Sequence, residues 1–410
     1  MKKKLTKSKL LIFLFVIMLF FVPATINKPK QTDDRTLCIG VGVDREHDGY
    51  VMSAQILVPE ANQVFKETLQ VYTAKGQSML ECVQYMSLHF GKVLGMGNVS
   101  VIVFGNDMAN EGIAQTLDFF LRSNRLNDNA TVLTTNTTAK ELLEKVSTID
   151  KSFSYSLNNL AKLNQDTIIS SSTNLFSFLS DYYGIKKASF VSQIRLESDE
   201  SLGIDSENQP ESGMTQSVAN TQNKNQSGQD NIVSNNGFTS LFVDGKQLTV
   251  LTPEQMKGFS VLDQGSRGVY TVKDVTDEFL THADIDMSIK IRNRNLWFSF
   301  KNGIPQAHYD LQYYVKIENI RQQNDTIILN GSKNYLSNKV RQKFVDLIKS
   351  QVAESVNISK EYNADVLNLK SLLKKFKHAE WQEYYNKLQD KDQAYQNIEF
   401  FVTVNVDAIL

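Results

Sequence analysis

The alternation of apolar and polar residues predicts a β-hairpin early in the chain. In "CIGVGVDREHDGYVMSAQILVP", residues 38–59, apolar residues occupy every second position up to Val43, and a similar alternation resumes from Tyr50. A period of two is that of a β-strand. The charged tip between the two runs ends in Asp48-Gly49, a dipeptide suited to a tight turn between antiparallel strands.

The next stretch of sequence alternates between strand and helix patterns. Ser78 and Glu81 form a capping box ahead of a helix in "GQSMLECVQYMSLHF", and Thr138 with Glu141 forms a second one. The expected elements are a strand at 69–74, a helix through Phe90, a buried strand at 99–105, a helix at 107–122, a strand at 130–135 and a helix from 138 to 146. Such alternation is typical of an α/β sheet domain.

Two further helical stretches, near 153–163 and 173–183, and a strand at 187–196 complete an expected N-terminal α/β domain over residues 37–196. Residues 197–236 differ in character, because they are rich in Ser, Asn, Gln and Asp and contain almost no residues that could form a core. This composition predicts a polar linker or insertion.

The second half of the chain predicts two more units. A hairpin around Asp244-Gly245 and a helix that begins at Thr252-Pro253 suggest a middle strand-rich domain over 237–282. A C-terminal α/β domain is expected over 283–410, with strands at 285–293, 296–302 and 309–320, helices at 333–357, 366–377 and 379–389, and a last strand from 398. The fold class is therefore mixed α/β, with two to three domains that each contain a sheet flanked by helices.

The N-terminus carries a hydrophobic segment behind a basic one. "MKKKLTKSK" precedes residues 10–22, which contain no charge and would rise only about 20 Å as a helix. Residues 1–27 are thus expected to be a signal peptide, cleaved after Ala24, or a retained membrane anchor, and residues 28–36 a polar spacer. Because the lysines stay in the cytoplasm, either reading delivers the rest of the chain across a membrane.

Composition gives no support for nucleic-acid binding or for cysteine-based chemistry. Of 410 residues, 44 are Lys or Arg and 45 are Asp or Glu, so bulk charge gives no indication of nucleic-acid binding. The two cysteines, Cys38 and Cys82, both lie in apolar patterned stretches. They are expected to be small core residues, and a disulfide between them stays open.

The opening hairpin matches two kinds of ligand-binding loop only in part. Gly40 and Gly42 match the start of a dinucleotide loop, but Arg45 stands at the third glycine position and a strand follows instead of a helix. An EF-hand requires a bidentate Glu where the chain has Gln55, although its first positions are matched by Asp44, Glu46, Asp48 and Gly49. A polar hairpin turn is therefore favoured over either loop.

No catalytic, cofactor-binding or metal-binding constellation is expected. The histidines lack a second His or Cys at ligand spacing; they are His47, His89, His282, His308 and His378. In "HAEWQEYY", Glu380 and Glu383 lie one turn apart, which predicts a solvated helix with Trp381 buried. The chain is expected to be no enzyme and to need no cofactor.

Four segments in this order resemble the Ger(x)C family of spore germination proteins, the C subunits of nutrient germinant receptors. They are "IGVGVDREHDGYVMSAQILVP", "GNDMANEGIAQTLDFFLR", "LFVDGKQLTVLTPEQMKGF" and "YNADVLNLKSLLKKFKHAEW". In the second segment the matching residues are Gly105, Ala109, Gly112, Leu117, Asp118, Phe119, Phe120 and Arg122, and in the fourth they are Asp365 and Trp381.

The resemblance implies a non-enzymatic, membrane-associated receptor subunit on the extracytoplasmic face of the spore inner membrane. Its implied partners are a multi-pass subunit and a large subunit with cytoplasmic domains. Family members usually carry a lipid-attachment cysteine after the signal peptide, but "LFFVPATIN" has none, so no lipid attachment is expected and the apolar segment itself would be the anchor. The alternatives are an unrelated extracytoplasmic ligand-binding or adhesion protein and a secreted hydrolase with dispersed carboxylates.

Overall fold

The structure is a computed structural model that describes most of the chain in separate ranges. These ranges are residues 35–59, 67–123, 126–149, 157, 173–198, 231–234, 237–263, 268–278, 280–322, 325–326 and 336–408. The signal or anchor segment 1–27, most of the spacer 28–36 and the helix expected near 153–163 therefore lie outside the described residues, apart from Leu157, which is buried.

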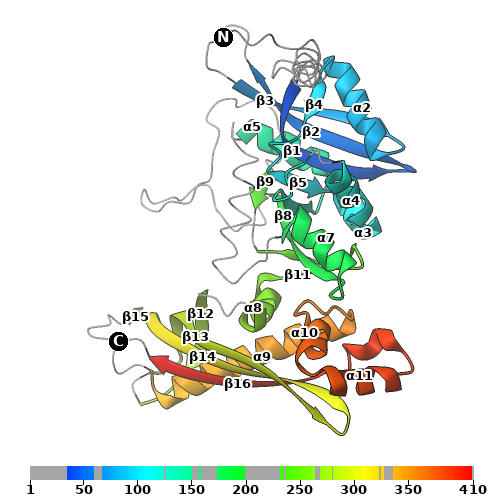
Figure 1. The fold of residues 1–410 in the computed structure, drawn as a ribbon. Helices are drawn as coiled ribbons and strands as arrows, with labels where there is room; N and C mark the ends of the chain where they lie inside the picture. Colours follow the sequence, from blue (N-terminus) through cyan, green and yellow to red (C-terminus); the bar gives the residue numbers. More distant parts are fainter. Residues whose placement is uncertain are drawn as a thin grey trace, which may run out of the picture.

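The described residues form two sheets, and the larger contains 11 strands (Figure 1). Its main path runs β11-β10-β8-β6-β5-β1-β2-β3, with β1, β5, β6 and β8 parallel in the centre and antiparallel pairs on both sides. The strands are β1 (Arg35–Glu46), β2 (Gly49–Pro59), β3 (Glu67–Gly76), β4 (Val93–Gly95), β5 (Val101–Phe104), β6 (Thr131–Thr135), β7 (Thr173–Asn174), β8 (Ala188–Ser198), β9 (Asn231–Ser234), β10 (Thr239–Val243) and β11 (Lys246–Leu251).

Helices cover both faces of this sheet. One face packs against α2 (Met79–Phe90), α3 (Asn106–Glu111), α4 (Ala114–Arg122) and α7 (Leu175–Tyr183). The other face packs against α5 (Ala139–Ile149), whose Leu142 and Leu143 are fully buried with Val101 and Val103. Because β5 is covered on both faces, it is apolar throughout, as expected for a buried parallel strand.

The helix expected at 107–122 is broken into α3 and α4, which corrects the sequence prediction. Gly112 between them has φ +130°, a backbone conformation that side chains rarely adopt. The amide of Ile113 donates to the carbonyl of Gly245 in the β10–β11 turn, 2.9 Å away. The amide at the start of α4 therefore hydrogen-bonds to a turn distant in sequence instead of continuing the hydrogen bonding of α3, and the two helices are separate.

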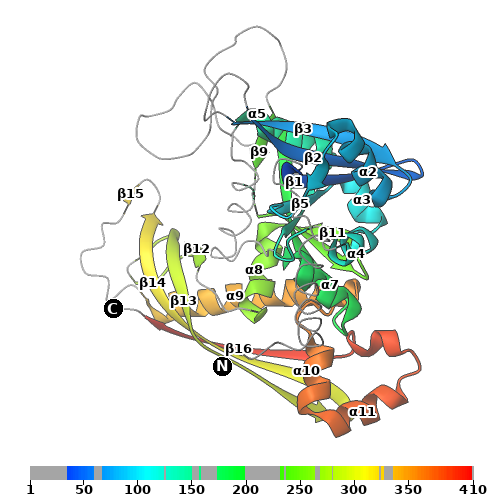
Figure 2. The ribbon, with the colours of Figure 1, turned by 45° about the horizontal axis from the view of Figure 1, so that its top comes forward.

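The smaller sheet contains 5 strands among the described residues, the last of which is the final strand of the chain (Figure 2). It comprises β12 (Gly268–Val275), β13 (Ala283–Lys301), β14 (Ile304–Gln322), β15 (Asp325–Thr326) and β16 (Glu399–Ala408). The strands expected at 285–293 and 296–302 form one strand, β13, with a shift of register between Ile291 and Asn293. β16 runs parallel to β14 and hydrogen-bonds to it along its whole length.

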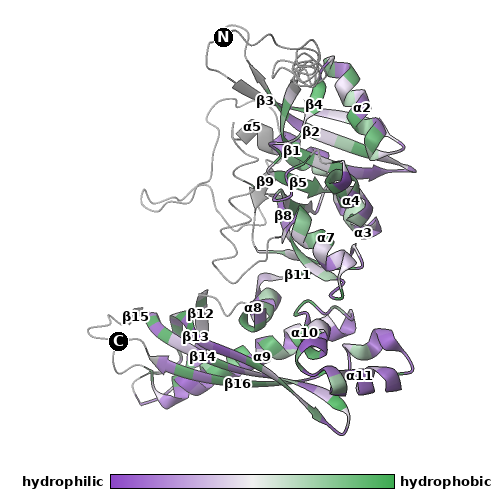
Figure 3. Ribbon diagram, in the orientation of Figure 1, coloured by the Kyte–Doolittle hydropathy of each residue, from purple (hydrophilic) through white to green (hydrophobic). Residues whose placement is uncertain are grey.

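One face of the smaller sheet is covered by helices. Its long helix α9 (Asn338–Glu361) buries Val340, Phe344 and Ile348 at the predicted four-residue spacing. The remaining elements are α10 (Leu369–Phe376), α11 (His378–Lys387) and a short 3₁₀ helix (Lys391–Ala394). Figure 3 shows hydrophobic and hydrophilic residues alternating along β16, which is the pattern of a strand with one covered and one solvated face.

Residues 237–282, expected as a middle strand-rich domain, are divided between the two sheets. β10 and β11 extend the larger sheet, β12 belongs to the smaller one, and α8 (Pro253–Asp263) packs against α9 between them. The end of the segment 197–236, expected as a polar linker, pairs with β8 as β9. The expected mixed class, with sheets flanked by helices, is confirmed.

Candidate interaction site

Three aromatic rings form a stack across the uncovered face of the smaller sheet. Trp297 on β13 is the register partner of His308 on β14, which is in turn the partner of Phe401 on β16. Ring centroids are 5.3 Å apart for Trp297 and His308 and 5.0 Å apart for His308 and Phe401, and the planes are nearly parallel. We call these three residues the aromatic ladder.

Strand alternation explains why the ladder points to solvent. The neighbours of His308 on β14, Ala307 and Tyr309, are buried in the core on the helix-covered side of the sheet. Successive side chains on a strand point to opposite faces, so His308 lies on the face away from the helices. Trp297 is 48% exposed and Phe401 45% exposed.

The residues around the ladder are polar and hydrogen-bonded. Ser299 donates to the amide oxygen of Gln306 at 3.0 Å, and it lies 2.7 Å from Nε2 of His308. The amide nitrogen of Gln306 donates to Glu399 at 2.7 Å, so one chain of hydrogen bonds crosses the same three strands as the ladder.

This group does not have the geometry of a hydrolase triad. A serine nucleophile requires a histidine that accepts its proton and a carboxylate that orients the histidine. Here the hydroxyl of Ser299 donates to Gln306. The carboxylate of Glu399 accepts a hydrogen bond from Gln306 and so does not orient the histidine. Exposed aromatic residues within a polar surround are instead the composition of protein-binding hot spots.

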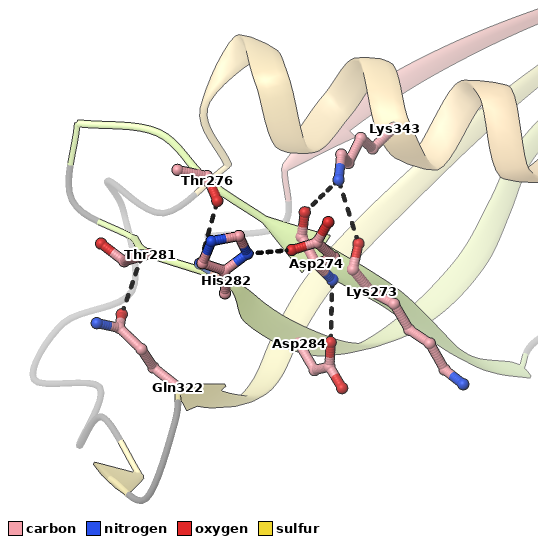
Figure 4. Close-up of polar contacts among 8 residues, drawn as sticks. All are labelled: Lys273, Asp274, Thr276, Thr281, His282, Asp284, Gln322 and Lys343. Carbon is pink, nitrogen blue, oxygen red and sulfur yellow. Dashed lines mark hydrogen bonds and ion pairs between the residues drawn. The ribbon is translucent and has the colours of Figure 1, made fainter.

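A second polar cluster lies at the other end of the sheet, where β12 meets β13 (Figure 4). Nδ1 of His282 lies 2.6 Å from the carboxylate of Asp274, and both residues have positive φ, 49° and 54°. The hydrogen bond from His282 lowers the pKa of Asp274. Lys343 of α9 donates to the carbonyls of Lys273 and Asp274, which joins the helix to the irregular end of β12. The side chains of His282 and Asp274 are 62% and 69% exposed, so the cluster is a surface contact that links β12, β13 and α9.

Two buried carboxylates bind helix N-termini of the protein itself. Asp44 accepts hydrogen bonds from the amides of Ala139 and Lys140 at 2.7 and 3.0 Å, at the start of α5. Asp365 accepts from Leu369 and Lys370 at 2.7 and 2.9 Å, at the start of α10. Burial raises the pKa of both, that of Asp365 to about 6, against the opposing effect of the amide donors. Asp44, considered above for calcium, is therefore committed to a helix cap.

The cysteines and the remaining hairpin residues occupy structural positions. Cys38 and Cys82 are buried and unbridged, as expected of core residues, and their thiols contact the carbonyls of Gly40 and Tyr50. Burial raises the pKa of Cys38 to about 12. Glu46, at the hairpin tip, pairs with Lys75. No group of three or more His, Cys, Asp or Glu side chains in the described ranges is arranged to hold a metal ion.

The five histidines lie at separate places in the described part of the chain. No hydrogen bond or ring contact among the described residues joins one of them to another. His89 packs beside Phe90, and Nδ1 of His378 lies 3.4 Å from the carbonyl of Lys374. Trp381 is 5% exposed in α11 while Glu383 pairs with Lys387 on its outer side, which confirms the predicted solvated helix. The sequence analysis did not predict the aromatic ladder. Aromatic residues at outward positions of paired strands are the signal that could have indicated it.

Among the residues that the structure describes, no helix combines the length and the apolar character that a membrane span requires.

Two protein-family models match most of the chain from residue 28 onward. The family described as "Spore germination protein N-terminal domain" matches residues 28–196, and that described as "Spore germination B3/ GerAC like, C-terminal" matches residues 239–409. The curated "Spore germination protein GerQC" of Bacillus cereus is 22% identical over 386 residues, which cover 92% of this chain and 94% of that protein.

A solved structure has a similar fold. "Crystal Structure of the GerBC protein" covers 90% of this chain and 97% of its own, with a TM-score of 0.51 and 14% sequence identity. At that identity the similarity concerns the fold alone, but it extends over both sheets. The two family matches, which together cover most of the chain, show that it belongs to the Ger(x)C family of spore germination proteins.

Proposed function

We propose that the chain is a non-enzymatic subunit of a spore germinant receptor, tethered to the membrane and acting through protein–protein contacts on its extracytoplasmic face. The observation that carries this proposal is the order and extent of the two family matches, which run from residue 28 to residue 409 with one gap. The apolar segment 10–22 behind a basic N-terminus supports the tether. The proposed partners are a multi-pass membrane subunit and a large subunit of the same receptor.

The aromatic ladder is the surface that we assign to contact with a receptor partner. Trp and Phe side chains supply large apolar area with few rotatable bonds, so burying them at an interface costs little conformational entropy. The stack already orders the rings in the free protein, and the hydrogen-bonded chain through Gln306 orders the polar groups beside them. Preorganisation of this kind favours binding because less freedom is lost on association.

The test uses spores that carry this receptor as their only nutrient receptor. Deleting the chain should abolish nutrient-triggered germination while leaving germination by a surfactant that bypasses nutrient receptors intact. In the full-length chain, the double variant Trp297→Ser, Phe401→Ser should reduce co-purification with the multi-pass subunit by about tenfold or more, the effect of losing a hot spot.

Val269→Ser is the matched control, because Val269 is 62% exposed on β12 of the same sheet but lies outside the ladder. This variant should leave both germination and co-purification unchanged. A normal nutrient response after deletion would contradict the receptor role. Normal co-purification of the ladder variant would contradict the assignment of the ladder while leaving the receptor role intact.

A further inference from the structure

Helix α2 exposes apolar side chains on the side that faces away from its sheet. Its inner side packs in the core through Met79, Cys82, Val83 and Met86. On its outer side Leu88 is 76% exposed, Tyr85 51% and Leu80 44%. An ordinary surface helix has one apolar stripe and a polar outer face, so a second apolar side indicates a further contact.

The C-terminal turn of α2 lies close to the point where the described chain begins. Ser87 near the end of α2 accepts a hydrogen bond from the amide of Leu94 on β4, and β4 pairs with the first residues of β1, Arg35 opposite Val93. Figure 1 shows α2 and β4 together at one end of the molecule, with the smaller sheet at the other end. This turn therefore lies close to Arg35, the first described residue.

The length of that segment limits how far this end can be from a bilayer. Residues 23–34 connect the apolar segment 10–22 to β1, and fully extended they would span at most about 40 Å. If residues 10–22 lie in the membrane, Arg35 stays within that distance of its surface. The helix that exposes Leu88 is then held at a high local concentration relative to lipid.

The chemistry of the surface suits a bilayer interface. Lys92 is exposed in the turn that follows α2, and anionic headgroups attract such side chains. Beside the helix is a shallow hollow of about 330 Å³, lined by residues that include Tyr72, Lys75, Tyr85 and Phe90. Tyrosine is favoured at membrane interfaces because its ring is apolar and its hydroxyl stays hydrated.

We propose that the outer side of α2, formed by Leu80, Tyr85, Leu88 and Lys92 and called here the α2 surface, rests on the membrane to which the chain is tethered. The occupant is the lipid surface itself, with the apolar side chains at the level of the headgroups and Lys92 at their edge. The smaller sheet with its aromatic ladder then points away from the bilayer. This inference rests on the proposed tether.

The experiment uses the full-length chain in vesicles of phosphatidylglycerol and phosphatidylethanolamine that contain a nitroxide-labelled lipid. An environment-sensitive dye is attached at Leu88→Cys or, as the matched control, at Val269→Cys on the smaller sheet. Both residues are more than half exposed, so both substitutions should leave the fold unchanged. The native cysteines are buried and should remain unlabelled in the folded chain. The dye at Leu88→Cys should lose most of its fluorescence to the nitroxide, and the dye at Val269→Cys should keep its fluorescence.

Three outcomes would overturn the inference, and flotation of the vesicles distinguishes them. If the chain floats with the vesicles but the dye at Leu88→Cys is unquenched, the tether stands and the lipid contact is wrong. If both dyes are quenched equally, the chain has no preferred face toward lipid. If the chain does not float, the proposed tether itself fails and this inference fails with it.

Discussion

Replacing Gly258 by alanine tests how closely α8 packs against α9, which is the contact that joins the middle segment to the smaller sheet. A Cβ atom at this position would lie 2.3 Å from the carbonyl oxygen of Gln351 and 2.3 Å from Oγ of Ser355. Both distances are far below van der Waals contact. Ser355 also donates to the carbonyl of Gln255 at 2.8 Å, so moving its side chain would break that hydrogen bond.

Two effects of opposite sign decide the result. In a helix interior alanine is favoured over glycine by about 1 kcal/mol, because glycine loses more conformational freedom on folding. Overpacking costs about 1–3 kcal/mol, and a value near the upper end applies because the carbonyl of Gln351 belongs to the backbone of α9 and cannot rotate away. Losing the hydrogen bond from Ser355 adds about 1 kcal/mol. Gly258→Ala should therefore lower the free energy of unfolding by about 3 kcal/mol.

The assay is urea-induced unfolding, followed by the fluorescence of Trp297 and Trp381, which both lie in the smaller-sheet half. Gly97→Ala is the control, because a Cβ at Gly97 would have no heavy atom within 4 Å. Its unfolding midpoint should stay at the wild-type value. Adding Ser355→Ala to Gly258→Ala should recover only part of the loss, since the clash with Gln351 remains. A stabilised Gly258→Ala variant would refute the close α8–α9 packing.

Three further predictions concern the buried polar groups. Burial raises the pKa of Asp365 from its unfolded value near 4 to about 6. The contribution of this group to stability is therefore present below pH 4 and is lost as the pH rises through 6. The free energy of unfolding, measured from pH 4 to 7, should fall by up to about 3 kcal/mol through this group, and Asp365→Asn should remove that part of the fall. Asp44→Ala removes the acceptor for two amides of α5 and should cost about 1–2 kcal/mol in urea unfolding, whereas Asp48→Ala at the exposed hairpin tip should cost almost nothing. Cys38 and Cys82 should resist a thiol reagent at pH 8 in the folded chain and both react after denaturation without reductant; a denatured chain with no reactive thiol would reveal a disulfide instead.

Local interactions were enough to predict the main elements. The opening hairpin forms as expected, but its two-residue turn is His47-Asp48, one position before the predicted Asp48-Gly49, because Glu46 pairs with Gly49 in β2. Ser78 caps α2 through the amide of Glu81 at 3.2 Å, and the stripe on α9 buries every fourth residue as its spacing indicates. In each case the residues that decide the structure lie within a few positions of one another, so a single stretch of sequence contains the information.

The candidate site could not be predicted in the same way. Trp297 and His308 face each other across the β13–β14 hairpin, but Phe401 joins them only because β16 pairs in parallel with β14 from far along the chain, and no local pattern specifies that register. The same holds for Asp365, which the family resemblance marked but whose role as the cap of α10 is visible only in the fold.

The sequence by itself determined the period of each strand and helix, most of their ends, the apolar N-terminal segment and the family. Only the tertiary structure decided that Gly245 would separate α3 from α4, that residues 237–282 would serve both sheets, and that α2 would keep a second apolar side exposed. The physical reason is the range of the interactions. Caps and turns act between near neighbours, whereas strand pairing and helix packing join residues far apart in the chain, and their register depends on all the other contacts formed at the same time.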